Sequence, residues 1–170
     1  MKILIFADSH GRTAGMIEAI EREQPDRVFH LGDYTEDVRE LRHIYPSLSI
    51  CGVRGNNDLD DAFGWYAVVP VGTLRAYLTH GHRERASMRS GGLVAHRARE
   101  EGCALAFFGH THRMVLEREQ GVLVCDPGSI SLPRGGPAGY ARLTIEKGQP
   151  GHLDLLDEDG ALLRREKIGG

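Results

Sequence analysis

The stretch that decides the fold is residues 2–10, KILIFADSH, in which an apolar run, Lys2–Ala7, leads directly into Asp8-Ser9-His10. A short run this rich in Ile, Leu and Phe predicts a buried β-strand. Residues two apart in an extended segment face the same side, so we expect Asp8 and His10 to point together. The polar cluster therefore marks a strand end of the kind where α/β folds build their sites.

Outward from this strand, helices and strands alternate over the first third of the chain. The other predicted strands are Arg27–Leu31 and Ser47–Gly52, and the predicted helices run from a Thr13 cap to about Glu23 and from Glu36 to Ile44. Pro25-Asp26 and Pro46 end these helices. Strands separated by helical segments predict a parallel βαβαβ sheet.

The rest of the chain supplies further strands and one helix. The predicted strands of the middle third are Trp65–Val71, Leu74–Thr79 and Ala104–Phe108, with a helix at about Gly92–Glu101. In the last third, Gln120-Gly121 signals a hairpin, and the predicted strands are Val115–Glu119, Val122–Cys125, Ala141–Glu146, His152–Leu156 and Ala161–Arg165, with Lys147–Gly151 joining the third to the fourth. We expect this last third to form an antiparallel meander. The simplest architecture is α/β, with two packed β-sheets flanked by helices, in a single domain of residues 1–170.

Composition and charge limit the class of protein. Hydrophobic residues make up 41% and charged residues 26% of the 170 residues, which is typical of a globular chain. No apolar run approaches the ~20 residues that cross a bilayer, and the N-terminus lacks the features of a signal peptide. We therefore expect a cytoplasmic protein without a membrane partner. A net charge of −3 disfavours polymeric nucleic acid but allows a small anionic substrate held by metal ions.

Five polar clusters fall at the ends of successive predicted strands. In chain order they are Asp8-Ser9-His10, Gly32-Asp33, Gly55-Asn56-Asn57-Asp58, Thr79-His80-Gly81-His82 and Gly109-His110-Thr111-His112. Taken singly, each has an ordinary alternative, such as a helix cap, a turn or partly exposed histidines. Together they indicate a metal site, and ligands of His, Asp and Asn without thiolate favour Mn, Fe, Zn or Ni. His30, inside a strand, is expected to be a hydrogen-bonded core residue.

The order of these motifs resembles the signature of the calcineurin-like metallophosphoesterases: Asp-x-His, Gly-Asp, Gly-Asn-x-Asp, His-Gly and Gly-His-x-His. The resemblance covers residues 1–134 and is to their small single-domain phosphodiesterase branch in bacteria and archaea. Residues 126–129, Asp-Pro-Gly-Ser, also match, except that the branch usually has Asn at the position of Asp126. The resemblance implies the four-layer metallophosphoesterase sandwich, which agrees with the two-sheet architecture.

The resemblance also implies a binuclear metal centre. Asp8, His10 and His112 would hold one ion, Asn56, His80 and His110 the second, and Asp33 would bridge them. Two divalent ions are expected, Mn first, with Fe, Zn or Ni as alternatives. The catalytic group would comprise Asp33, Asn56, His82 and Asp58, with His82 near substrate or a ligand and Asp58 orienting a loop or ligand.

The implied activity is metal-dependent hydrolysis of small phosphoesters, especially phosphodiesters, by a metal-bridging hydroxide that attacks phosphorus in line. Many family members have a His that assists the leaving group where this chain has Asn57, which cannot act as an acid. We therefore expect either a steep dependence on the leaving group or another acid such as His82. The alternative is a non-catalytic protein-binding scaffold on the same fold. The substrate, the role of Asp126 and a possible homo-oligomer stay open.

Overall fold

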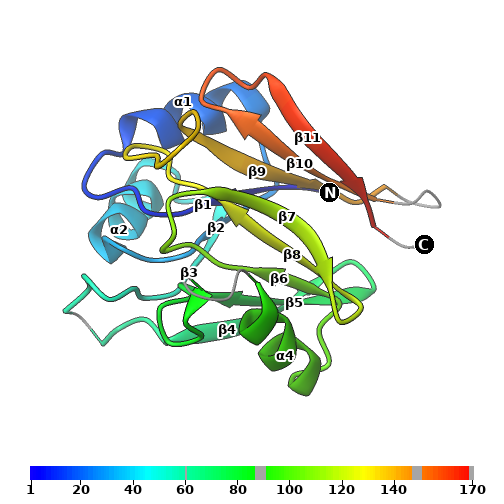
Figure 1. The fold of residues 1–170 in the computed structure, drawn as a ribbon. Coiled ribbons are helices and arrows are strands. Elements are labelled where there is room, and N and C mark those ends of the chain that lie inside the picture. The colour runs from blue at the N-terminus through cyan, green and yellow to red at the C-terminus, as the bar shows by residue number, and fades with distance from the viewer. Residues whose placement is uncertain (60, 87–90, 147–150, 169–170) are drawn as a thin grey trace.

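The computed structural model describes residues 1–59, 61–86, 91–146 and 151–168 (Figure 1). The predicted connection Lys147–Gly151 lies, except for its last residue, outside them. No helix within these ranges is long and apolar enough to cross a membrane. The strands are β1 (Lys2–Phe6), β2 (Arg27–His30), β3 (Ser49–Gly52), β4 (Tyr66–Val71), β5 (Leu74–Thr79), β6 (Leu105–Phe107), β7 (Met114–Glu119), β8 (Val122–Pro127), β9 (Gly139–Thr144), β10 (His152–Asp157) and β11 (Leu162–Lys167), and the helices are α1 (Ala14–Glu23), α2 (Thr35–Ile44) and α4 (Gly92–Glu100).

The first sheet has the strand order β11-β10-β9-β1-β2-β3. The strands β1, β2 and β3 are parallel, with α1 and α2 as the crossovers, so the predicted βαβαβ unit is confirmed. Thr13 stands at the start of α1, but its side chain makes no capping hydrogen bond. It bonds the carboxylate of Glu40 on α2 instead, at 3.3 Å.

The second sheet has the order β4-β5-β6-β8-β7. Its β7–β8 hairpin turns at Gln120-Gly121, and positive φ angles of 53° and 84° are those of a tight type I′ turn. The prediction of one meander over the last third was wrong in its extent, because this hairpin belongs to the second sheet. Only β9, β10 and β11 form a meander, and β9 returns to pair antiparallel with β1.

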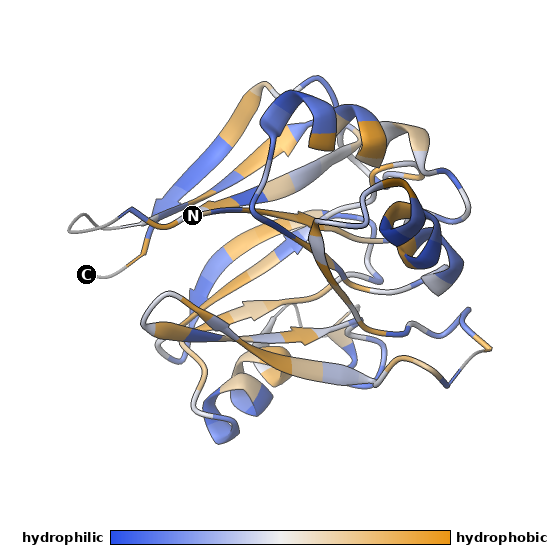
Figure 2. Ribbon diagram, turned by 180° about the vertical axis from the view of Figure 1, so that it is seen from behind, coloured by the Kyte–Doolittle hydropathy of each residue, from blue (hydrophilic) through white to orange (hydrophobic). Residues whose placement is uncertain are grey.

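The two sheets pack face to face between helices, which confirms the predicted four-layer α/β sandwich (Figures 1 and 2). Alternation along β1 shows why: Ile3 and Ile5 enter the core between the sheets, whereas Leu4 and Phe6 pack under α1 and α2. The helix α4 covers the outer face of the second sheet in the same way, through a third apolar cluster. This stacking leaves the loops after the strands at one end of both sheets free for polar residues.

Candidate metal centre

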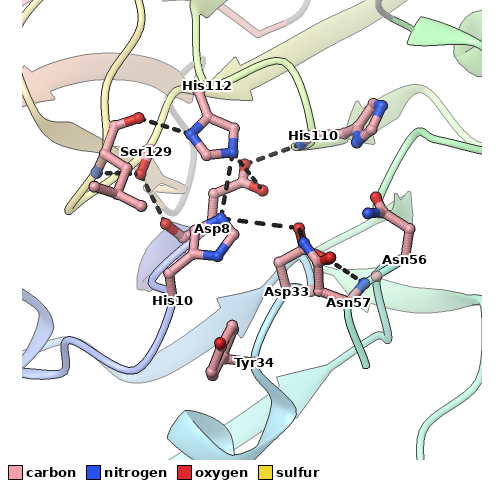
Figure 3. Close-up of polar contacts among 12 residues, drawn as sticks. Asp8, His10, Asp33, Tyr34, Asn56, Asn57, His110, His112 and Ser129 are labelled. Atoms are coloured by element: carbon pink, nitrogen blue, oxygen red, sulfur yellow. Dashed lines mark hydrogen bonds and ion pairs between the residues drawn. The ribbon is translucent and has the colours of Figure 1, made fainter. Parts of the chain in front are cut away.

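Five loops at one end of the sandwich carry the predicted ligands. Because parallel strands of one sheet end at the same edge, residues far apart in sequence meet there. The backbone N–H of His110, for example, donates to Asp8 Oδ2 at 2.9 Å across 102 positions of sequence. Figure 3 shows six of these side chains gathered around one space: Asp8 and His10 after β1, Asp33 after β2, Asn56 after β3, and His110 and His112 after β6. The seventh, His80, follows β5.

His80 presents an unprotonated nitrogen to the site. Its Nδ1 lies 2.8 Å from the Leu31 carbonyl oxygen, which only accepts, so Nδ1 carries the proton. Burial lowers the pKa of His80 to about 4, so the ring is neutral and its Nε2 atom carries a lone pair without a proton. That lone pair faces Asn56 Oδ1 at 3.1 Å and Asp33 Oδ1 at 3.3 Å. Three electron-rich atoms converging in this way fit a cation between them.

His112 has the same arrangement as His80, with Nδ1 bonded to a backbone carbonyl and Nε2 facing the other ligands. Its Nδ1 donates to the Leu132 carbonyl oxygen at 2.7 Å, and burial lowers the pKa of the ring. The free Nε2 lies 3.3 Å from His10 Nε2 and 3.5 Å from Asp8 Oδ1. A histidine whose second nitrogen is tied to a backbone carbonyl is the usual form of a metal ligand, because the tie sets tautomer and ring orientation.

Asp8 connects the two sides. The residue is fully buried, and its Oδ1 has no hydrogen-bond donor among the described residues. Burial raises the pKa of Asp8 well above its usual range, and the carboxylates of Asp126 and Asp33 raise it further. The ligand atoms of two groups, Asp8–His10–His112 and Asp8–Asp33–His80, each lie within 4.8 Å of one another. A buried carboxylate without a counter-charge is unfavourable, so these donor sets fit divalent ions.

Asp33 belongs to the second group and also lies close to His10 of the first. Its Oδ1 faces His80, and its Oδ2 is 3.9 Å from His10 Nε2. Asn57 holds both carboxylate oxygens, donating its backbone N–H to Oδ1 at 3.0 Å and its amide to Oδ2 at 2.6 Å. Position 55 must be glycine, since a Cβ there would overlap Asp33 Oδ1. Asn57 therefore positions Asp33 in the centre.

Asp58 stabilises the loop that presents Asp33. Its carboxylate accepts backbone N–H groups from Asp33, Tyr34 and Thr35 at 2.7–3.1 Å, and from Gly55 at 2.7 Å. The loop needs this support because Gly32, Asp33 and Tyr34 have consecutive positive φ angles of 95°, 57° and 83°. Asp58 thus touches backbone rather than the space between the ligands.

His110 and His82 lie at the second-sheet side of the centre. The His110 ring centroid is 5.2 Å from that of His80, but neither compact donor group found in the described residues includes His110. His82 packs edge-on against Trp65, with centroids 5.4 Å apart, and its Nδ1 is buried without a partner in the described part of the chain. Burial lowers the pKa of both rings.

The family model for the calcineurin-like phosphoesterase superfamily domain matches residues 1–148 of the chain. This protein belongs to the calcineurin-like phosphoesterase superfamily. It is 33% identical over 150 residues to YsnB of Bacillus subtilis, a probable metallophosphoesterase, covering 86% of this chain and 85% of that one. It is 28% identical over 152 residues to the phosphodiesterase MJ0936 of Methanocaldococcus jannaschii, covering 75% and 83%.

Solved structures share the metallophosphoesterase fold. A predicted phosphoesterase from Streptococcus pneumoniae has a TM-score of 0.80 and 28% identity, with 98% of this chain and 97% of that chain covered. Vacuolar protein sorting 29 from Cryptosporidium parvum has a TM-score of 0.79 over 99% and 98% of the two chains. At 19% identity the second likeness shows the fold alone.

Asp126, which departs from the motif of the metallophosphoesterase branch, lies behind the two histidines of the last cluster. It is fully buried, accepting from the Thr111 hydroxyl at 2.5 Å and from the Gly128 N–H at 2.8 Å. Burial raises the pKa of Asp126 to about 7. Its contact with Thr111 secures the loop between His110 and His112.

Three further residues border this metallophosphoesterase centre: Arg134, where the sequence resemblance ends, Tyr34, which gave no sequence signal, and His30, which was predicted to be a core residue. Arg134 is exposed, and after the effect of burial its charge further lowers the pKa of His110 and His112. Tyr34 lies beside His10, with the ring centroids 5.5 Å apart. His30 is a buried core residue as expected, and it bonds Ser9 Oγ through Nε2 at 2.8 Å. For Tyr34, only the contacts made by the folded chain distinguish it from other tyrosines.

Proposed function

We propose that this metallophosphoesterase is a phosphodiesterase with a binuclear centre. The observation that carries the proposal is the pair of neutral histidines, His80 and His112, whose free Nε2 atoms face carboxylate and amide oxygens at 3.1–3.5 Å. The likeness to a phosphodiesterase from Methanocaldococcus jannaschii supports the choice of diesters. The donor set of nitrogen and oxygen suits Mn, with Fe, Zn or Ni as alternatives.

The residues would divide between two ions. We assign Asp8, His10 and His112 to one ion, Asn56, His80 and His110 to the other, and Asp33 to both. Two such ions would supply hydroxide near neutral pH for attack on phosphorus and would offset the charge of the phosphate. The chain contributes the fixed orientation of the ligands: Leu31 and Leu132 set the histidine tautomers, and Asn57 and Asp58 hold Asp33.

The leaving group poses a separate question. Asn57 donates its backbone N–H and its side-chain amide to Asp33 and has no acidic proton, so it supplies none to the departing alcohol. His82, whose pKa is lowered by burial, is the alternative donor that we consider. We propose that the enzyme relies on good leaving groups. Rates measured over aryl phosphodiesters of increasing leaving-group pKa should fall steeply, and a flat series would contradict this.

Hydrolysis of bis-p-nitrophenyl phosphate and p-nitrophenyl phosphate, with and without Mn²⁺, tests the proposal. We expect Mn²⁺-dependent cleavage of the diester and a loss of more than about 100-fold in Asp33→Ala, because a ligand to both ions is removed. The matched control is Asp159→Ala, an exposed aspartate far along the chain. If neither compound is cleaved with Mn, Fe, Zn or Ni, the result would instead favour the non-catalytic protein-binding scaffold.

A further inference from the structure

Tyr34 stands beside the metal centre with its ring in solvent. Its exposed fraction is 41%, although the residues next to it, Asp33 and Thr35, are buried. The ring lies next to His10, at 5.5 Å between centroids and tilted by 58°. Figure 3 shows the tyrosine below His10 and Asp33, at the edge of the space that the ligands enclose. A group bound at the centre would therefore reach this ring.

The backbone of Tyr34 is in a conformation that a bulky residue rarely adopts. Its φ of 83° and ψ of 72° are left-handed, and Gly32 and Asp33 before it also have positive φ. Such conformations are unfavourable and persist only where the surroundings hold them. Here Asp58 holds Tyr34 by accepting its N–H at 2.9 Å. Asn or Gly would suit this backbone better, so the tyrosine side chain opposes the local conformational preference.

We propose that Tyr34 is a specificity-determining residue that receives the planar organic group of a phosphoester bound at the metal centre. This inference rests on the proposed function, since it places the phosphate among the ligands. A tyrosine ring offers an apolar face to a planar group and a hydroxyl at its rim. The Tyr34 hydroxyl makes no hydrogen bond to the described residues, so it is available to a ligand. The favoured substrates are phosphoesters with an aromatic or similarly flat group on the ester oxygen.

A packing role for Tyr34 makes the opposite prediction. The ring lies over Gly11, where an added Cβ would be 3.7 Å from it. If this contact were the purpose of the tyrosine, its removal would lower the stability of the protein and leave ligand preference unchanged. If the ring receives substrate, removal would relieve the left-handed strain and alter ligand preference without lowering stability.

The test uses Tyr34→Asn in the full Mn²⁺-loaded chain, because Asn tolerates the left-handed backbone. Isothermal titration calorimetry with phenylphosphonate and methylphosphonate, which are not hydrolysed, measures the preference for a flat group. We expect the ratio of the two affinities to fall about threefold to tenfold, the usual range for one aromatic contact. The Tm should not fall, and the affinity for Mn²⁺ should not change. Tyr66→Asn is the matched control, an exposed tyrosine on β4 that stacks on Tyr77, and it should keep the original ratio.

An unchanged ratio in Tyr34→Asn would overturn the inference, and a lowered Tm with it would establish the packing role. Because phosphonates are not cleaved, the ratio decides the role of Tyr34 even if the protein hydrolyses no diester. If the ratio falls but no diester is cleaved, the proposed reaction is wrong and the proposed contact of Tyr34 with a flat group is supported. Failure of the unmodified Mn²⁺-loaded protein to bind either phosphonate would overturn both.

Discussion

Two regions of the molecule bury carboxylates, and they treat the charge in opposite ways. On the first sheet, Asp154 accepts two bonds from Arg165 at 2.6 and 3.0 Å and one from Arg142 at 2.9 Å. Arg142 also bonds Glu23 at the end of α1, at 2.8 Å. Burial opposes a lower pKa, but Arg165 and Arg142 lower the pKa of Asp154, and Arg142 lowers that of Glu23. This region supplies its own counter-charges.

In the described part of the chain, no arginine or lysine bonds a carboxylate of the metal centre. Burial and neighbouring carboxylates raise the pKa of Asp8, whereas Arg134, the cation that offsets it, is exposed. Burial lowers the pKa of His80 and of His112, so these rings are neutral, and their free nitrogens add electron density instead of removing it. The sandwich can thus neutralise a buried carboxylate with arginine, whereas at this end of the sheets we expect a bound ion to supply the positive charge.

The largest effect that we expect is on metal binding, and it tests whether Asp8 differs from the arginine-paired Asp154. In Asp8→Asn, the affinity for Mn²⁺ measured by calorimetry should fall by about 100-fold or more, since a buried ligand of one ion loses its charge. The free energy of unfolding of the metal-free protein should rise, because a buried unpaired charge is removed and the new amide can donate to His112 Nε2. Urea unfolding in EDTA checks the second effect. A less stable metal-free variant would show that Asp8 is compensated in some other way.

A pH dependence follows from His80. Its folded pKa of about 4 lies below the usual value of 6.5, so the unfolded chain binds more protons between these values. The stabilising contribution is complete above pH 6.5 and is lost as the pH falls toward 4, by about 3 kcal/mol in total. Urea unfolding of the metal-free protein across this range should show the loss, and His80→Asn should reduce it. The exposed His43 provides a control, and His43→Asn should keep the full slope.

The smallest expected effect is in the compensated region. Asp154→Asn should destabilise the protein by about 2 kcal/mol, below the ~3–5 kcal/mol of a deeply buried pair, because Arg165 is half-exposed. Mn²⁺ affinity should not change. Urea unfolding beside Asp159→Asn, an exposed aspartate, measures the difference. If the two variants are equally stable, the ion pairs of Asp154 with the arginines make no net contribution to the free energy of unfolding. The two regions would then not differ in how they compensate a buried carboxylate.

Most of the fold was predictable because its signals are local. Periodicity placed each strand and helix within a few residues of its observed position, and a two-residue turn located the β7–β8 hairpin. The sheet that each late strand joins was not predictable. Strand β8 pairs parallel with β6, and β9 pairs antiparallel with β1, and both pairings depend on which apolar faces meet in the folded chain.

By itself, the sequence determined the sandwich architecture and the order of polar clusters at strand ends, because alternation and motif spacing are properties of short segments. The tertiary structure decided which atoms of those clusters face one another. The free Nε2 of His80 depends on a carbonyl 49 positions away, and the strained backbone at Tyr34 depends on a carboxylate 24 positions away. Such long-range contacts set tautomer, charge and exposure, and these in turn determine what the site can bind.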